Sequence, residues 1–157
     1  MDNVHTLRDT YAADMVSLWV ENGGGYCGMA YIMTSVSTSF ENYAFQIVMR
    51  SCATGYYSFG HEFGHIQSAR HDWYKDPTNN SPYTYNHGYV APSKTWRTIM
   101  AYGDDCGGCT RIQYWSNPDV LYNGVPMGIS EGSYHAADNR KTLNNTAYTV
   151  ANFRVGI

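Results

Sequence analysis

The sequence predicts an α+β domain with an α/β-type upper half and a loop-rich lower half. In the first part of the chain, two expected helices flank three apolar stretches of strand length. From 72 to 97 this pattern is lost, and Pro, Asn, Tyr and Gly dominate. The chain has 157 residues, which is enough to bury roughly two thirds of its unfolded surface in one domain.

The first twenty residues predict a helix followed by a strand. Val4, Leu7 and Tyr11 share one helical face, and residues 15–20 (MVSLWV) form an apolar run that we expect to be a buried strand. The sequence Glu-Asn-Gly-Gly-Gly that follows this run is typical of a turn.

Residues 28–33 and 45–50 predict two further strands, joined by a polar connection. If the two strands pair in an antiparallel manner, the numbers of paired residues sum to about 78. Cys27 and Cys52 then lie nearly opposite each other. The expected register therefore favours a Cys27–Cys52 disulfide.

The other two cysteines, Cys106 and Cys109, flank a pair of glycines. A structural zinc site would need two more ligands, and a thioredoxin-like redox motif should open a helix after a strand. This pair lies instead in a glycine-rich loop. A Cys106–Cys109 disulfide is therefore the simplest interpretation, with the metal and redox interpretations left open.

Two helices are expected in the rest of the chain. Thr54 is a candidate N-cap for a helix that contains Gly60 and Gly64, which would allow close packing or leave room beside a bound group. The last twenty or so residues form an amphipathic helix, with Ser133 as a candidate cap. Its apolar positions are Leu143, Ala147, Val150 and Phe153.

Residues 61–72, which read HEFGHIQSARHD, carry the strongest chemical signal in the sequence. His61 and His65 are four residues apart, so a helix places both side chains on one face, where they can bind one Zn²⁺. Glu62 projects about 100° further round the helix and can reach a water without being a ligand. This is the H-E-x-x-H arrangement of two zinc ligands and a general base.

His71 lies six residues after His65. On a continuous helix it would point about 240° away from that residue. His71 can complete a three-histidine site only if the helix ends between them and the chain folds back. Three protein ligands and one open position are typical of catalytic zinc.

This motif, with Met100 downstream in TIMAY, resembles that of the metzincin clan of zinc endopeptidases. The chain is most similar to the reprolysin-like secreted enzymes of the bacterial peptidyl-Asp metalloendopeptidase type. Three further stretches carry that resemblance: LRDTYAADMVSLWV (7–20), RSCATGYYSFGHEFGH (50–65) and RIQYWSNPDVLYNG (111–124). One residue departs from the family pattern, because Ser68 stands where the family has a glycine that turns the backbone, often with positive φ.

The resemblance implies a single metzincin-like catalytic domain over residues 1–157. Its expected parts are a small mixed sheet of about three strands, the active-site helix, a loop-rich lower half and the C-terminal helix. The strand, helix and strand that begin the family fold are absent from this sequence. Either the chain is trimmed at its N-terminus or its fold is minimal, and the sequence leaves both open.

The resemblance also implies an activity, the hydrolysis of peptide bonds with one catalytic Zn²⁺. His61, His65 and His71 would hold the metal through neutral imidazoles. Glu62 would take a proton from the attacking water and pass it to the leaving amine. Met100 would form an apolar floor beneath the ligands.

Substrate contacts follow from the same resemblance. Tyr102 would hydrogen-bond the developing oxyanion or approach the zinc, although an ordinary packed tyrosine is the alternative interpretation. Arg111 would select an acidic residue after the cut through a bidentate pair, although a surface arginine is the simpler interpretation. The strand that binds an extended polypeptide by backbone hydrogen bonds would contain Gly28, Met29, Ala30 and Tyr31.

Composition limits the partners and the location of the protein. With a net charge of −3 and 15% charged residues, nothing indicates a nucleic-acid partner. No apolar run is long enough to cross a membrane, and no signal peptide is present. We expect a secreted, monomeric protein whose signal peptide and any prodomain lie outside this sequence.

Two other functions remain open at this point: a non-catalytic binding module stabilised by zinc, and a zinc amidase that acts on a small substrate. Asp104 and Asp105 could contribute to a Ca²⁺ site, but a solvated loop tip is the simpler interpretation. His5, His87 and His135 lack ligand spacing, so we expect them to be surface or structural residues.

Overall fold

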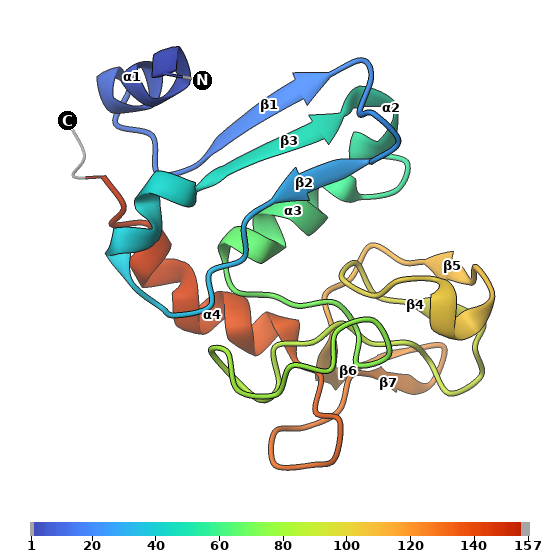
Figure 1. Cartoon of the computed structure of the whole chain (residues 1–157). Helices are drawn as coiled ribbons and strands as arrows, with labels where there is room; N and C mark the ends of the chain where they lie inside the picture. The colour runs from blue at the N-terminus through green and yellow to red at the C-terminus, as the bar shows by residue number, and fades with distance from the viewer. Residues whose placement is uncertain (1, 155–157) are drawn as a thin grey trace.

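The computed structural model describes residues 2–154 and contains the expected mixture of helices and short strands (Figure 1). The first part of the chain forms α1 (Asp2–Thr10), β1 (Val16–Val20), β2 (Gly28–Ala30), the 3-10 helix η1 (Thr38–Tyr43), β3 (Phe45–Met49), α2 (Arg50–Ala53) and α3 (Ser58–Ile66). The second part forms β4 (Trp96–Arg97), the 3-10 helix η2 (Asp104–Cys106), β5 (Thr110–Arg111), β6 (Asn117–Tyr122), β7 (Val125–Met127) and α4 (Asn139–Val150).

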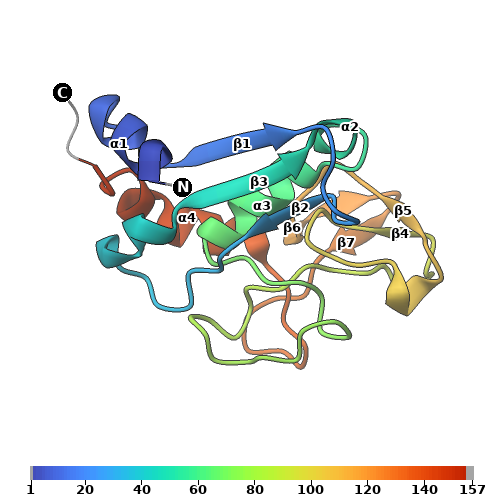
Figure 2. The ribbon, with the colours of Figure 1, turned by 45° about the horizontal axis from the view of Figure 1, so that its top comes forward.

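The first part is built around a mixed three-stranded sheet. Its strand order is β1-β3-β2, with β1 parallel and β2 antiparallel to β3. Helix α3 packs against β2 and β3 on one face of the sheet (Figure 2). In the view of Figure 1, this helix lies between the sheet and the loops of the second part. The predicted α+β class is therefore confirmed.

The β2–β3 pairing is antiparallel as predicted, but its register differs by two residues. Gly28 pairs with Val48, whereas the expected register would have paired it with Arg50. Arg50 is not available to the sheet, because it begins α2. A shift of two residues keeps every side chain on its expected face.

The strand predicted at 28–33 ends early, at Ala30. Further along, the Met33 N–H donates to the carbonyl of His65 at the end of α3, which takes the chain out of the sheet. Strand β1 is also less buried than expected. It is an edge strand of the described sheet, and Leu18 and Trp19 are each 49% exposed.

Both expected helix caps were wrong. Thr54 ends α2, and α3 begins after Tyr57, whose φ of +57° places it in the left-handed region without a side-chain cap. Helix α4 begins after Asp138, whose carboxylate accepts the Lys141 N–H at 2.9 Å. Ser133 lies in a separate turn, so α4 is shorter than the predicted twenty residues.

The main hydrophobic core lies where the sheet, α3 and α4 meet. It is formed by Met33, Ala44, Ile66, Val150 and Phe153. Disulfides join Cys27 to Cys52 and Cys106 to Cys109, the pairs expected from the sequence. Within residues 2–154, no helix combines the length and apolar character needed to cross a bilayer.

Candidate active site

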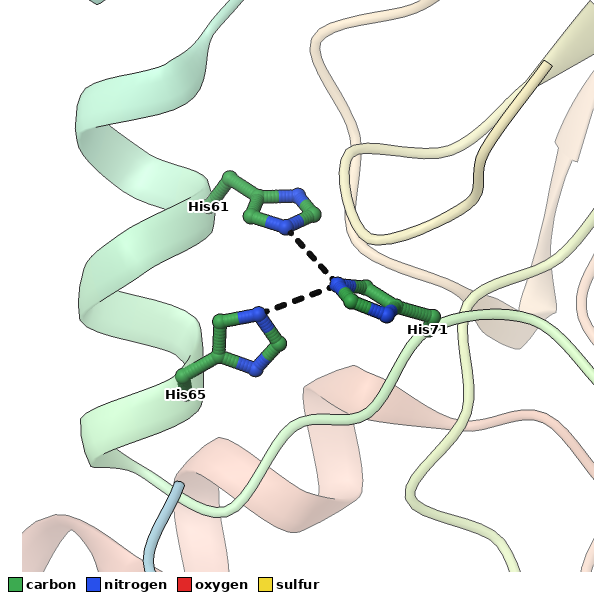
Figure 3. A group of neighbouring side chains, drawn as sticks. All are labelled: His61, His65 and His71. Carbon is green, nitrogen blue, oxygen red and sulfur yellow. Dashed lines mark hydrogen bonds between the residues drawn. The ribbon is translucent and has the colours of Figure 1, made fainter. Parts of the chain in front are cut away.

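Three histidine side chains from two segments meet at one point (Figure 3). His61 and His65 extend from α3, and His71 comes from the chain that follows the helix. Nε2 of His71 lies 3.2 Å from Nε2 of His61 and 3.1 Å from Nε2 of His65. The spacing of these residues in the sequence therefore corresponds to a real cluster in space.

A tight turn at the end of α3 returns the chain to the helix. Ser68 has a φ of +70°, and the Ala69 N–H donates to the Gly64 carbonyl at 2.8 Å. Ser68 thus adopts the backbone conformation that a glycine would take most easily, at a cost on the order of 1 kcal/mol. The departure from the family pattern affects the energy of the turn and not the direction of His71.

Backbone carbonyls fix the orientation of the imidazole rings. His61 Nδ1 donates to the Ile99 carbonyl at 2.9 Å, and His65 Nδ1 donates to the Ala69 carbonyl at 2.8 Å. Because a carbonyl can only accept, each Nδ1 carries the proton and each Nε2 presents a lone pair. Nδ1 of His87 lies 2.8 Å from the His71 carbonyl.

The donor set fits a Zn²⁺ ion. Burial is the main cause that lowers the pKa of His65 to about 4 and that of His71 to about 3, and it also lowers the pKa of His61 well below 6.5. The imidazoles are therefore neutral at pH 7. One His71 proton could not satisfy both neighbouring lone pairs, whereas a cation among three nitrogens would satisfy all of them.

Met100 packs against the helix that carries the histidines. It is fully buried in a cluster with Ala69 and Ile99. A Cβ on Gly64 would lie only 2.7 Å from the Met100 Sδ, so Gly64 is needed for this close approach. Gly60 differs, because a Cβ there would meet nothing within 4 Å.

Glu62 lies in a cleft of about 460 Å³ beside His61. Glu62 is only 6% exposed, and burial raises the pKa of its carboxyl from 4.5 to about 7. The positive charge of Arg111 lowers this pKa, but by less than burial raises it. Other residues that line the cleft include Gly28, Tyr56, Ser58, Lys75, Arg97, Tyr102 and Arg111. A carboxylate with this pKa is suited to accept and return a proton near neutral pH.

Tyr102 and Arg111 both reach this cleft. The Tyr102 ring centre lies 4.4 Å from that of His71. Arg111 donates from Nη1 to the Tyr56 carbonyl at 2.9 Å, while its Nε is buried without a partner. Within the described chain it makes no ion pair, and burial, followed by repulsion from Arg97, lowers its pKa to about 10. Arg111 is therefore a half-buried residue of the cleft, and its role in substrate selection stays a prediction.

The sequence predicted no role for three residues of this region. Asp72 accepts the Tyr102 backbone N–H at 2.8 Å and so fixes the start of the loop after Met100. Arg97 and Lys75 add two cations to the cleft. The position of Asp72 directly after His71 was a usable signal, whereas nothing in the sequence brings Arg97 next to Arg111.

The remaining candidate residues have ordinary environments. Gly28 lines the cleft, while Met29 and Tyr31 are more than half exposed beside the unpaired edge of β2. Asp104 pairs with Lys75, and Asp105 pairs with Lys94, so any Ca²⁺ would have to compete with two lysines. His87 is structural, as expected, because both of its nitrogens lie 2.8 Å from backbone carbonyls.

The metal-free protein should lose stability as the pH falls from about 6.5 to about 4.5. In this window the three histidines stay neutral when folded and become protonated on unfolding, which favours the unfolded state. Glu62 opposes this effect, because its pKa is about 7 in the folded state and 4.5 in the unfolded state. Between these pH values the folded state binds a proton that the unfolded state does not, which favours folding. Each net proton contributes about 1.4 kcal/mol per pH unit.

Denaturant unfolding of chelator-treated protein between pH 4.5 and 7 measures this dependence. The Glu62→Gln variant is the matched control, because it removes the one opposing group in the cluster. Its stability should fall more steeply with acid than that of the wild type. Equal slopes for the two proteins would show that the carboxyl of Glu62 does not have a raised pKa.

The mixed sheet and the helix that carries two of the three converging histidines form the arrangement expected of a metzincin-like domain, and the three histidines could hold a metal ion. A model described as "Reprolysin_5: Metallo-peptidase family M12" matches residues 1–116. The chain belongs to metallopeptidase family M12.

Curated relatives support this assignment. The chain is 51% identical to a peptidyl-Asp metalloendopeptidase of Stenotrophomonas maltophilia (strain R551-3), over 98% of this chain and 35% of the relative. A Pseudomonas fragi protein of the same name is 46% identical, over 76% of this chain and 72% of the relative. The chain therefore spans about a third of the first relative. A solved structure titled "Structure of a chaperone-substrate complex" shares the fold, with a TM-score of 0.70, 21% identity, and coverage of 99% of this chain and 23% of that chain.

Proposed function

We propose that this chain is the catalytic domain of a secreted, monomeric zinc endopeptidase. The observation that carries the proposal is the meeting of three Nε2 atoms beside the buried carboxylate of Glu62. His61, His65 and His71 would hold the ion. Zn²⁺ bound there would lower the pKa of a water towards 7 and polarise the carbonyl of the scissile bond.

The side chains of this chain then have separate roles. Glu62 takes a proton from the attacking water and returns it to the nitrogen of the leaving amine. The Tyr102 hydroxyl donates a hydrogen bond to the developing oxyanion, where a fixed donor stabilises charge that forms only in the transition state. The carbonyls that accept from His61 and His65 keep the Nε2 atoms aimed at the centre.

A polypeptide is the substrate that this cleft suits. The outer edge of β2 is unpaired in the described sheet, so an extended peptide can add to it by backbone hydrogen bonds. Arg111 in the same cleft has a guanidinium with no carboxylate partner in the described structure. We assign it to the acidic side chain after the cut, as the names of the relatives suggest.

The two alternatives from the sequence are less well supported. A non-catalytic zinc module would not need a buried glutamate with a raised pKa beside the ligands. A small-molecule amidase would not need an open strand edge beside the cleft. Zinc analysis of the purified protein, combined with peptide-library cleavage with and without a chelator, tests the proposal. One zinc per chain and chelator-sensitive cleavage are expected, and zinc binding without cleavage would favour the binding module.

Arg111→Ala should abolish any preference for Asp or Glu on the carboxyl side of the cut. The physical reason is the loss of the uncompensated guanidinium, since a charge-assisted hydrogen bond contributes about 1.5–3 kcal/mol, or roughly 10- to 100-fold in kcat/KM. Cleavage-site profiling by mass spectrometry, together with kcat/KM for matched Asp and Asn peptides, measures the effect.

Arg50→Ala is the control, because Arg50 is exposed, pairs with Glu21 and lies outside the cleft. It should keep the specificity of the wild type. A preference for large apolar residues in the wild type would contradict the Arg111 assignment. The pocket would then be an apolar slot lined by residues such as Tyr114 or Trp115.

A further inference from the structure

Gly28, the first residue of β2, lies directly against the side chain of Glu62. A Cβ built on Gly28 would be 2.5 Å from Oε1, 2.7 Å from Cγ and 2.8 Å from Cδ of Glu62. Real Cβ atoms essentially never approach other atoms this closely. The bare backbone of Gly28 therefore forms one wall of the space that the carboxylate occupies.

Backbone conformation does not explain the glycine at this position. Gly28 is in an ordinary strand and is not among the described glycines with positive φ. Another residue could adopt the same backbone at little cost. The observation that requires glycine here is the contact with Glu62.

The strand cannot easily move away from the helix. Cys27, next to Gly28, is joined by a disulfide to Cys52 of α2 and accepts the Met49 N–H through its carbonyl at 2.9 Å. Gly28 itself pairs with Val48 of β3. These three links hold the start of β2 in place, so the side chain of Glu62 is the part that would have to yield.

We propose that Gly28 is a positioning residue that keeps Glu62 in its working rotamer. This inference rests on the proposed role of Glu62 as the proton acceptor. The wall confines the carboxylate to the cleft beside His61, and a methyl group on the wall would turn it away from the attacking water. A misplacement of about 1 Å at such a group can lower the rate about 100-fold.

Gly28→Ala should lower kcat about 10- to 100-fold with little change in KM, while bound zinc and the melting temperature stay close to those of the wild type. The clash falls on a side chain that can rotate, which is why the fold and the metal should survive. Gly60→Ala is the control, because a Cβ at that helix position meets nothing within 4 Å. It should leave kcat, KM and zinc content unchanged.

A double-mutant cycle separates positioning from an independent effect. Glu62→Asp shortens the side chain and leaves room for the new methyl group, so it should cost much less activity in the Gly28→Ala background than in the wild type. Zinc titration of all four proteins gives a readout independent of turnover. Fold-losses that simply multiply, or a rise in KM alone, would overturn the positioning role.

The remaining outcomes also decide the question. If Gly28→Ala loses zinc or fails to fold, the strand has yielded instead of Glu62, and the inference is wrong. If Gly28→Ala is fully active while Glu62→Gln is inactive, only the positioning role fails. If Glu62→Gln is itself fully active, the proposed function of the carboxylate fails first.

Discussion

Glu62→Gln should lose peptide hydrolysis by about 10²- to 10⁴-fold while it keeps the fold and the zinc. Glutamine has the same shape as glutamate, but its amide cannot take a proton from water at neutral pH. Glu62 is not one of the three residues whose ligand atoms converge, so the metal site formed by the histidines should be unchanged. Burial raises the pKa of the Glu62 carboxyl to about 7, so its surroundings already accommodate a neutral group. A neutral amide should therefore fit in its place.

Steady-state kinetics with a peptide substrate, zinc content and thermal unfolding together measure this result. Glu131→Gln is the matched control, because Glu131 pairs with Lys141 at the surface and does not line the cleft. It should behave as the wild type. Near-normal hydrolysis by Glu62→Gln would mean that another group accepts the proton.

The ligand cluster could be predicted because it depends on short-range geometry. A spacing of four residues on a helix fixes the relative positions of His61 and His65 whatever surrounds them. His71 can reach the other two histidines only if the helix ends before it and the chain turns back. The positive φ of Ser68 forms this turn. The two disulfide pairs also lie where the sequence placed them, while the role of Met100 beneath the ligands stays a prediction.

Features that depend on packing between distant segments could not be predicted. The strand register was wrong by two residues because α2 begins at Arg50, and no sequence signal marked that short helix. The contact of Gly28 with Glu62 depends on the distance between β2 and α3. The approach of Arg97 to Arg111 likewise depends on how the β4–β5 pair folds over the cleft.

His71→Ala should weaken zinc binding at least about 100-fold although His71 lies outside the helical motif. Changes to groups that merely orient a metal ligand already cost about 10- to 100-fold in affinity, so removal of the ligand itself should cost more. The two remaining imidazoles keep their carbonyl partners, Ile99 and Ala69, and therefore keep their orientation. The loss should come from coordination and not from unfolding.

Competition with a chromophoric chelator measures the zinc affinity, and circular dichroism of the metal-free proteins checks the fold. His5→Ala is the control, because His5 packs beside Phe45 and is not part of the ligand cluster. It should bind zinc as the wild type does. Full zinc occupancy of His71→Ala under competition would contradict the three-histidine centre, and the short Nε2 contacts of His71 would then be a packing feature of the loop.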